Sequence, residues 1–219
     1  MFSLTKQLDV GGARLPFVQY VACMAVIEAV QQLVQEVRLP PYVHLLYSTP
    51  YNAETMMCQP CNARRCSQDH QGDLLLRVKW PNDLYSEDGL KVGGILCHSA
   101  YKGGRFSATV GVGLNVTNDQ PTTCVQSLLQ RRLGSGVGVS REALLARIVN
   151  AMEGHLHTLE RDGFDPLQQA YLRYWLHTGQ RVEVEGAEHV TIRGLSPGGF
   201  LLAEDPQGGG VELHPDGNR

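Results

Sequence analysis

The residues best suited to chemistry lie in one stretch of this 219-residue chain, where a polar turn is followed closely by a strand that carries a lysine. Asn82 and Asp83 lie at a predicted turn, where short polar side chains can bond to nearby backbone or to a ligand. Lys91 opens an apolar run in which Gly93 and Gly94 remove side chains, as happens where a backbone must come close to another group. Alone, each piece is commonly a turn or a solvated lysine. Together they indicate the centre of an enzyme active site.

These residues must be positioned by a sheet. An apolar run that passes into alternating residues predicts a strand over 74–80, and Pro81 ends it because proline has no N–H for the ladder. Further strands are predicted at 2–5, from Val92 onward and at 106–116. Their alternation and their glycine-containing bends suit a mixed or antiparallel sheet.

Helices are predicted to cover this sheet. One begins at Pro16 and ends near Pro40, and another follows Ser140, whose hydroxyl suits a helix N-cap. The apolar face of the first is predicted to hold Val26, Val30, Leu33 and Val37. The apolar stripe of the second is predicted to hold Leu145, Val149, Met152, Leu156 and Leu159. A further helix is predicted to start at Asp165.

The pattern changes at residue 180 to short β-like runs separated by turns that contain glycine and proline. The runs are 181–185, 190–194, 200–203 and 211–214. They predict a small β-barrel that packs on the larger part, because about forty residues are too few for an independent core.

Several segments resemble one known family. The run KWPND at 79–83, followed by KVGGIL at 91–96, resembles the signature of the biotin protein ligases, called holocarboxylase synthetases in eukaryotes. The runs VGVGLNV at 110–116 and YLRYW at 171–175 resemble further segments of that family, and HPDGN at 214–218 looks like its eukaryotic branch. The resemblance implies an α+β fold: a mixed, mostly antiparallel sheet with flanking helices, similar to class II synthetases, and an SH3-like β-barrel module at the C-terminus. The implied parts are a catalytic domain at 1–178 and an incomplete barrel module at 179–219.

The resemblance also implies a reaction and its partners. The family joins biotin to ATP as biotinyl-adenylate and passes biotin to a lysine on the biotin carboxyl carrier domains of carboxylases, with Mg²⁺ as the metal. Lys91 would be catalytic and would contact biotin. Its implied neighbours are Gly93 and Gly94 for biotin, and Asn82, Asp83, Gly111, Gly113 and Asn115 for ATP and Mg²⁺.

Two departures from the family pattern leave alternatives open. The family carries a Gly/Arg-rich loop that closes over biotin upstream of the segment matched by residues 2–4, and this sequence begins after it. We therefore do not assume that this chain is active by itself. The alternatives are an inactive acceptor-binding fragment and a lipoate ligase-like enzyme. The other departure is an insertion at 39–73, where Cys58, Cys61, Cys66 and His70 have the residue types and spacing of a zinc set. The absence of periodicity there favours free thiols over a metal site.

Composition excludes other classes of protein. The chain is 42% apolar and 19% charged with a formal charge of −3, so we expect no nucleic-acid partner. The apolar run at 20–27 is too short for a membrane span and has no basic flank, so we expect a cytoplasmic protein without membrane contact, a mitochondrial form being left open. The six cysteines do not form the spread pattern of a secreted disulfide scaffold, and Cys23, Cys97 and Cys124 are expected to be small buried side chains.

Overall fold

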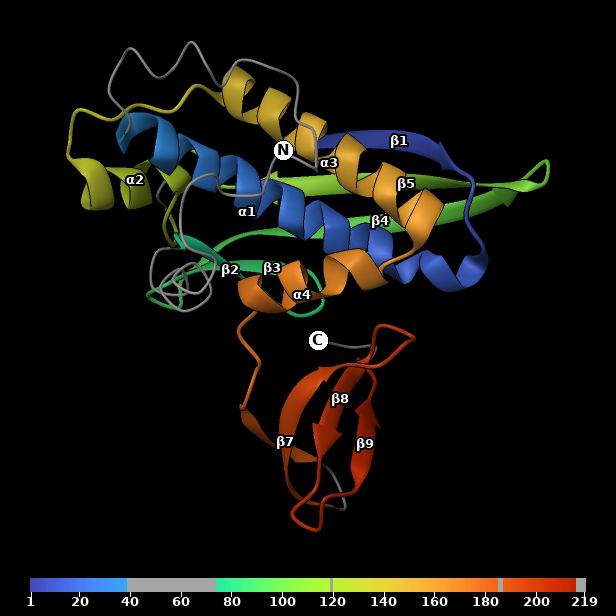
Figure 1. Cartoon of the computed structure of the whole chain (residues 1–219). Helices are drawn as coiled ribbons and strands as arrows, with labels where there is room; N and C mark the ends of the chain where they lie inside the picture. The colour runs from blue at the N-terminus through green and yellow to red at the C-terminus, as the bar shows by residue number, and fades with distance from the viewer. Residues whose placement is uncertain (39–73, 119, 185–186, 216–219) are drawn as a thin grey trace, which may run out of the picture.

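The computed structural model describes residues 1–38, 74–118, 120–184 and 187–215, which form helices and two antiparallel sheets (Figure 1). The larger sheet has five strands in the order β1-β5-β4-β3-β2, and every neighbouring pair is antiparallel. Its strands are β1 Phe2–Leu8, β2 Leu76–Lys79, β3 Asp83–Ser86, β4 Lys91–Lys102 and β5 Arg105–Leu114. The helices are α1 Pro16–Arg38, α2 Val125–Leu133, α3 Arg141–Asp162 and α4 Asp165–Tyr174, with a short 3-10 helix at Gly12–Arg14. The predicted α+β class with an antiparallel sheet is confirmed.

Strand β3 was not predicted. Pro81 ends β2 as expected, after a cis peptide bond from Trp80, but the turn comprises only residues 80–82. Asp83 already belongs to β3 and pairs with Lys79 across the hairpin. Because β3 has only four residues, it is too short to show a clear alternation in the sequence.

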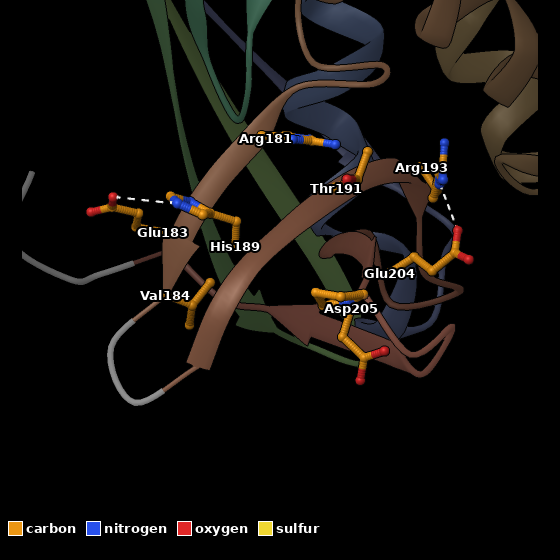
Figure 2. A pocket seen from close by; sticks show the side chains of 9 residues that line it. Arg181, Glu183, Val184, His189, Thr191, Arg193, Glu204 and Asp205 are labelled. Carbon is orange, nitrogen blue, oxygen red and sulfur yellow. Dashed lines mark hydrogen bonds and ion pairs between the residues drawn. The ribbon is translucent and has the colours of Figure 1, made fainter.

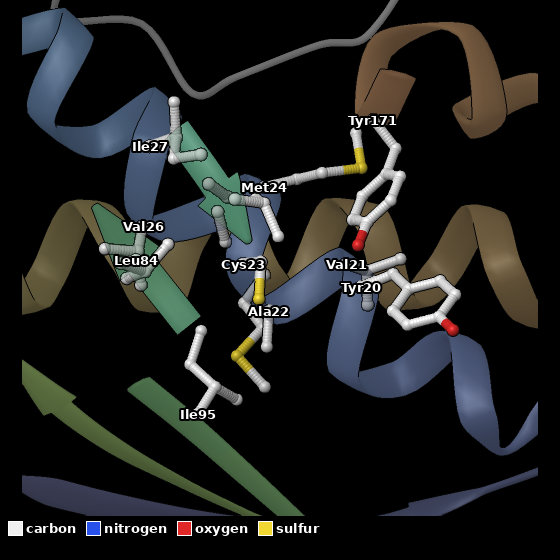
Figure 3. Close-up of a cluster of buried hydrophobic side chains, with 14 of the residues drawn as sticks. Tyr20, Val21, Ala22, Cys23, Met24, Val26, Ile27, Leu84, Ile95 and Tyr171 are labelled. Atoms are coloured by element: carbon white, nitrogen blue, oxygen red, sulfur yellow. The ribbon is translucent and has the colours of Figure 1, made fainter. Parts of the chain in front are cut away.

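Helix α1 is the centre of the core rather than a helix with one apolar face. All residues from Tyr20 to Val30 are buried, and α1 packs against the sheet, α3 and α4 (Figure 3). A helix that is apolar all round is buried all round. The predicted face was therefore wrong at Val37, which is 49% exposed near the end of the helix.

One charged residue lies within the fully buried stretch of this helix. Glu28 of α1 is buried and accepts a 2.7 Å hydrogen bond from Nε2 of His155, with Tyr174 donating to its other oxygen at 3.3 Å. A buried carboxylate needs such partners. The contact therefore fixes α1 against α3 and α4.

Helix α3 buries a different stripe from the predicted one in its first half. Leu145 and Val149 are 39% and 38% exposed, whereas Leu144 and Ile148 are buried. Met152, Leu156 and Leu159 are buried as predicted. The predicted stripe is displaced by one residue along the helix in this half. The reason is that several patterns with spacings of three and four fit an apolar-rich helix equally well.

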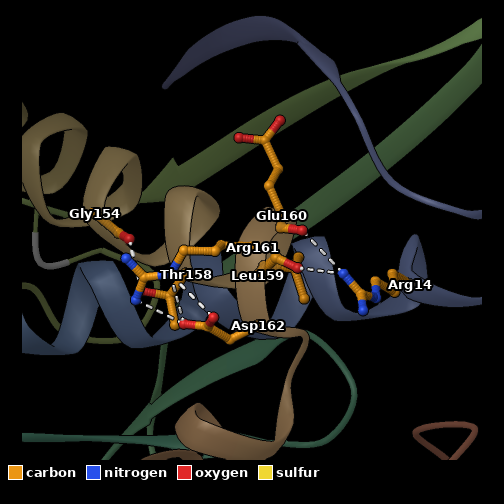
Figure 4. A network of polar contacts seen from close by, with 7 residues as sticks. All are labelled: Arg14, Gly154, Thr158, Leu159, Glu160, Arg161 and Asp162. Carbon is orange, nitrogen blue, oxygen red and sulfur yellow. Dashed lines mark hydrogen bonds and ion pairs between the residues drawn. The ribbon is translucent and has the colours of Figure 1, made fainter.

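Both ends of α3 are capped by side chains. At its start the Ser140 hydroxyl accepts from the Ala143 N–H at 3.1 Å, which confirms the predicted N-cap. At its end Arg14 donates to the carbonyls of Leu159 and Glu160 at 3.2 and 3.0 Å (Figure 4). A guanidinium there satisfies free carbonyls and complements the helix dipole.

The second sheet is an antiparallel meander in the order β6-β7-β8-β9. Its strands are β6 Arg181–Val184, β7 Ala187–Leu195, β8 Leu201–Glu204 and β9 Gly210–Leu213. Because β6 and β9 do not pair within the described residues, closure into an SH3-like barrel is not confirmed. One face joins the main core through Ile192, Leu195 and Leu201. Another surface lines an open hollow of about 800 Å³ with charged side chains, including the Arg193–Glu204 pair at 2.7 Å (Figure 2).

The segment Gly12–Val37 satisfies the length and hydropathy criteria of a membrane-crossing helix, with a mean hydropathy of 1.5. However, 78% of the most apolar window is buried inside the fold. A core helix such as α1 meets the same criteria.

Candidate active site

Lys91 and Asp83, the two charged residues singled out from the sequence, are brought together by the sheet. Lys91 is the first residue of β4 and Asp83 the first of β3, and the Lys91 Nζ lies 2.7 Å from the Asp83 Oδ1. The side chains are 48% and 28% exposed, so the pair is open to solvent. An exposed ion pair contributes only about 0–1 kcal/mol to stability. Its main consequence is that the ammonium is held in place while remaining accessible.

Gly94 provides the space for this ion pair. It pairs with Asp83 across the strands, and a Cβ added at Gly94 would lie 2.9 Å from the Asp83 Oδ1 and 3.9 Å from the Lys91 Cε. Gly93 is required for a different reason, because its Cβ would collide with the backbone carbonyl of Gly113 in β5. Gly94 therefore leaves room for the ion pair, and Gly93 allows β4 to pack closely on β5.

Gly111 and Gly113 extend a bare backbone surface next to the ion pair. Gly94 pairs with Gly113, and Leu96 pairs with Gly111. These residues alternate with the buried Val110 and Val112, so they lie on the face of the sheet away from the helices. At Gly111 and Gly113 an added Cβ would meet only backbone oxygens at 3.7 Å, and the adjacent Leu96 is 65% exposed. Backbone without side chains thus borders an accessible ammonium.

Asn115 lies at one end of this surface and fixes the segment that follows β5 through hydrogen bonds. Its side-chain amide donates to the Thr122 hydroxyl at 3.4 Å and to the Thr123 carbonyl at 3.3 Å, while its oxygen accepts from Asn118 at 3.1 Å. The Thr122 hydroxyl in turn donates to the Lys91 carbonyl at 2.6 Å. Asn115 therefore ties the segment after β5 to the residue that carries the ammonium.

The turn at residues 80–82, called the Trp80 turn, lies at another side of the ion pair. The Asn82 carbonyl accepts from the Ile95 N–H at 2.9 Å, which attaches the turn to β4. The Trp80 backbone N–H donates to Nε2 of His177 at 2.9 Å, and its indole N–H donates to the Tyr20 hydroxyl at 2.8 Å and the Gly199 carbonyl at 3.2 Å. Trp80 is therefore held by hydrogen bonds to three distant segments.

Among the described cysteines, Cys23 and Cys97 do not offer a reactive thiolate. Burial raises the pKa of Cys23 above its usual range and that of Cys97 to about 12, so both thiols stay protonated near neutral pH. Cys23 and Cys124 are buried as expected, while Cys97 is only half-buried.

The part of the chain that the structure describes contains no group of three or more histidine, cysteine or acidic residues able to hold a metal ion. The possible zinc ligands Cys58, Cys61, Cys66 and His70 lie outside the described residues.

Several residues around the site were not found from the sequence, namely Tyr20, Thr122, His177 and Gly199. Each acts through a contact made by folding: His177, for example, is 97 positions from Trp80. No local pattern marks such a pair. The sites named from the sequence were those in compact motifs.

Solved structures show which fold this is. The chain superposes on the apo biotin protein ligase of Aquifex aeolicus with a TM-score of 0.60 and 16% identity, over 96% of this chain and 78% of that one. The biotin protein ligase from the same organism in complex with biotin and ATP gives a TM-score of 0.60 at 17% identity, over 96% and 74%. The fold is that of biotin protein ligases.

Sequence relatives identify the family. The profile of the biotin/lipoate A/B protein ligase family matches residues 1–115, more than half of the chain. Over the whole chain, the sequence is 36% identical to the chloroplastic biotin--protein ligase 1 of Arabidopsis thaliana, covering 52% of that protein. It is 33% identical to the biotin--protein ligase of Homo sapiens over 94% of this chain and 24% of the human protein. The chain belongs to the biotin/lipoate A/B protein ligase family, and it spans about half the length of the Arabidopsis protein.

Proposed function

We propose that this chain carries the catalytic residues of a biotin protein ligase. It would form biotinyl-adenylate from biotin and ATP and then transfer biotin to a lysine of an acceptor protein. The observation that carries the proposal is the Lys91–Asp83 pair beside the bare backbone of Gly94 and Gly113, in a chain whose relatives are named biotin--protein ligases.

Lys91 is the residue on which the first step depends. In that step a biotin carboxylate oxygen attacks the α-phosphorus of ATP, the bond to the β-phosphate bridging oxygen breaks, and pyrophosphate leaves. Two anions must approach each other, and negative charge accumulates on the α-phosphate. A fixed ammonium lowers this repulsion and stabilises the crowded transition state. In the second step the neutral amine of the acceptor lysine attacks the acyl carbon, AMP leaves with the bonding electron pair, and the amine loses a proton.

Asp83 has two compatible roles. Its Oδ1 orients Lys91, and its other oxygen is available to a Mg²⁺ ion either directly or through water, with the amide oxygen of Asn82 next to it in the chain. One carboxylate is a weak site alone, but Mg²⁺ usually keeps several waters and takes its remaining ligands from substrate phosphates. The residues present therefore fit a metal that arrives with ATP.

The glycine surface favours a flat, apolar substrate. Biotin's bicyclic ring would lie against Gly94. Gly111 and Gly113, which the resemblance implies for ATP, continue the same surface toward Leu96, and Gly93 allows the close approach of β4 to β5. Asn115 would act on the nucleotide through the loop that it ties to Lys91. Carrier domains of carboxylases would supply the acceptor lysine.

Biotin-dependent exchange of pyrophosphate into ATP tests this proposal, because it requires only the first step. The proposal requires that purified residues 1–219 with Mg²⁺ catalyse exchange with biotin, and much less with lipoate or without an organic acid. Exchange with lipoate alone would transfer the assignment to the lipoate branch of the family. Binding of a biotin carrier domain without any exchange would favour an acceptor-binding role without turnover.

A further inference from the structure

We propose that His177 is a positioning residue: it holds the Trp80 turn in the register that places Asp83 against Lys91. The structural part of this inference stands on geometry, and only its kinetic part rests on the proposed function. It gives the segment between α4 and the C-terminal sheet a direct role in the site.

This segment runs beside the edge strand β2 as a short parallel extension of the sheet. Trp175 forms a parallel bridge with Val78, and the Leu176 N–H donates to the Val78 carbonyl at 2.9 Å. In a parallel ladder the next bond would run from the Trp80 N–H to the carbonyl of Leu176. Instead that N–H donates to Nε2 of His177 at 2.9 Å. The imidazole therefore replaces a backbone carbonyl at the point where the chain turns away from the ladder.

The ring is fixed in the state that this bond needs. A backbone N–H can only donate, so Nε2 must accept, and Nδ1 then carries the proton and donates to Oε1 of Gln180 at 2.8 Å. His177 is 8% exposed, and its ring meets Trp175 edge to face at 5.5 Å between centroids. Both ring nitrogens and the ring orientation are thus determined by neighbouring groups.

The position of Trp80 is transmitted to the ion pair over three residues. After Trp80 the chain passes through Pro81 and Asn82 to Asp83. Within this turn the Asn82 carbonyl is bound by the Ile95 N–H, and the Trp80 indole is held by Tyr20 and Gly199. If Trp80 loses its backbone partner, the start of β3 can shift, and the 2.7 Å contact between Lys91 and Asp83 is the first to change.

Three variants separate positioning from simple support. His177→Leu fills the space without an acceptor. His177→Gln can present an amide oxygen near the position of Nε2. His157→Leu makes the same change as the first variant at an exposed position on α3 and serves as the control.

The structural test uses two signals that need no activity. The chain has two tryptophans, so ¹⁵N-tryptophan labelling reports the Trp80 backbone N–H directly. It also has four lysines, so ¹³C-dimethylation with a Lys91→Arg assignment isolates the Lys91 signal. In His177→Leu we expect hydrogen exchange at Trp80 to be faster by on the order of tenfold or more. The Lys91 signal should move toward that of the exposed Lys102. Both signals should stay near wild type in His177→Gln and His157→Leu.

The kinetic test is pyrophosphate exchange in the same proteins. His177→Leu should lower kcat on the order of tenfold or more, with a smaller change in the KM for biotin, because a displaced catalytic group costs rate rather than binding. His177→Gln should recover most of the rate. If His177→Leu does not fold, Gln180→Ala replaces it, because this variant removes the acceptor of Nδ1. Trp80 hydrogen exchange and the Lys91 dimethyl signal should then shift in the same directions, by smaller amounts.

Each contrary result has a distinct meaning. An unchanged Trp80 exchange rate in His177→Leu would show that the hydrogen bond is not made. Faster Trp80 exchange with an unchanged Lys91 signal and rate would reduce His177 to local support and overturn the positioning role. Absence of exchange activity in the wild type would refute the proposed function, while the two signals would still decide whether His177 positions the turn.

Discussion

The Lys91 ammonium is held by one carboxylate, and its side chain remains 48% exposed. A fully buried lysine would favour the neutral amine, and a lysine without a partner would not have its charge fixed at one position. The arrangement suits a group that must meet anionic substrates arriving from solvent. Gly94 makes it possible, because any side chain there would press on Asp83.

At the residue scale, His177 predicts a pH dependence of stability. Burial lowers the pKa of His177 below its usual value of 6.5, Lys79 adds to the lowering, and the Gln180 hydrogen bond partly opposes it. The unfolded chain therefore binds the proton first as the pH falls. Stability from this residue is present above about pH 6.5 and is lost as the pH falls below it.

Urea unfolding at about pH 7.5 and pH 5.5 measures this effect. The free energy of unfolding should fall less between the two values in His177→Gln than in wild type, because glutamine does not titrate. An equal fall in both proteins would contradict the neutral, buried state of His177. His157→Leu, which changes an exposed histidine, should behave like wild type.

The site could be predicted from the sequence where its residues lie in compact motifs. Lys91, Asp83 and Gly94 come within twelve positions, and the sheet does bring them together. The partners of Trp80 could not be predicted in this way, because Tyr20, His177 and Gly199 reach it only through tertiary packing. The roles of the predicted residues toward biotin, ATP and Mg²⁺ stay predictions.

At the element scale, the glycines of β4 and β5 differ in how much a side chain would cost. A Cβ at Gly93 would collide with the Gly113 backbone, which cannot rotate away, so Gly93→Ala should lower the free energy of unfolding by about 1–3 kcal/mol. Gly111→Ala meets only ordinary contact at 3.7 Å and should change it by less than about 0.5 kcal/mol. Urea denaturation of both variants checks this. Equal losses would mean that strand propensity, rather than the close approach, decides the cost.

Helix positions could be predicted better than the faces that the helices bury. The first helix was expected from Pro16, and α1 begins there, yet its apolar residues surround it because it runs through the centre of the core. In α3 the predicted stripe was off by one residue at Leu145 and Val149. Which side of an apolar-rich helix is covered depends on neighbours that the local sequence does not name.

At the scale of the whole molecule, Tyr20 of α1 links the C-terminal sheet to the Trp80 turn of the main sheet. Its hydroxyl donates to the Gly199 carbonyl and accepts from the Trp80 indole. Tyr20→Phe should therefore cost about 1 kcal/mol of stability and loosen the sheet against the turn. Thermal unfolding, with hydrogen exchange of the Trp80 indole, measures both effects.

Tyr171→Phe is the matched control. The Tyr171 hydroxyl is buried, and no hydrogen-bond partner for it exists among the described residues. Removing it should leave stability unchanged or slightly raised, since an unsatisfied buried hydroxyl is itself costly. A larger loss for Tyr171→Phe than for Tyr20→Phe would contradict the assigned hydrogen bonds.

The strands of the second sheet could be predicted because the sequence pattern changes at residue 180. The division into a catalytic domain and a C-terminal module stays a prediction. A barrel was predicted from the short β-like runs as well as from the resemblance, and the described strands form an open meander. Strand order in the main sheet could not be derived locally either, since β1 and β5 pair across about a hundred residues.

Biotin-dependent pyrophosphate exchange in Lys91→Ala beside Lys102→Ala tests the role of the Lys91 ammonium directly. Lys102 is an exposed lysine at the other end of the same strand, so it controls for the loss of a positive charge. We predict that Lys91→Ala loses activity by on the order of a hundredfold or more, while Lys102→Ala and the melting temperatures of both variants stay near wild type. Exchange that is active in wild type and unimpaired in Lys91→Ala would show that the first step does not depend on Lys91.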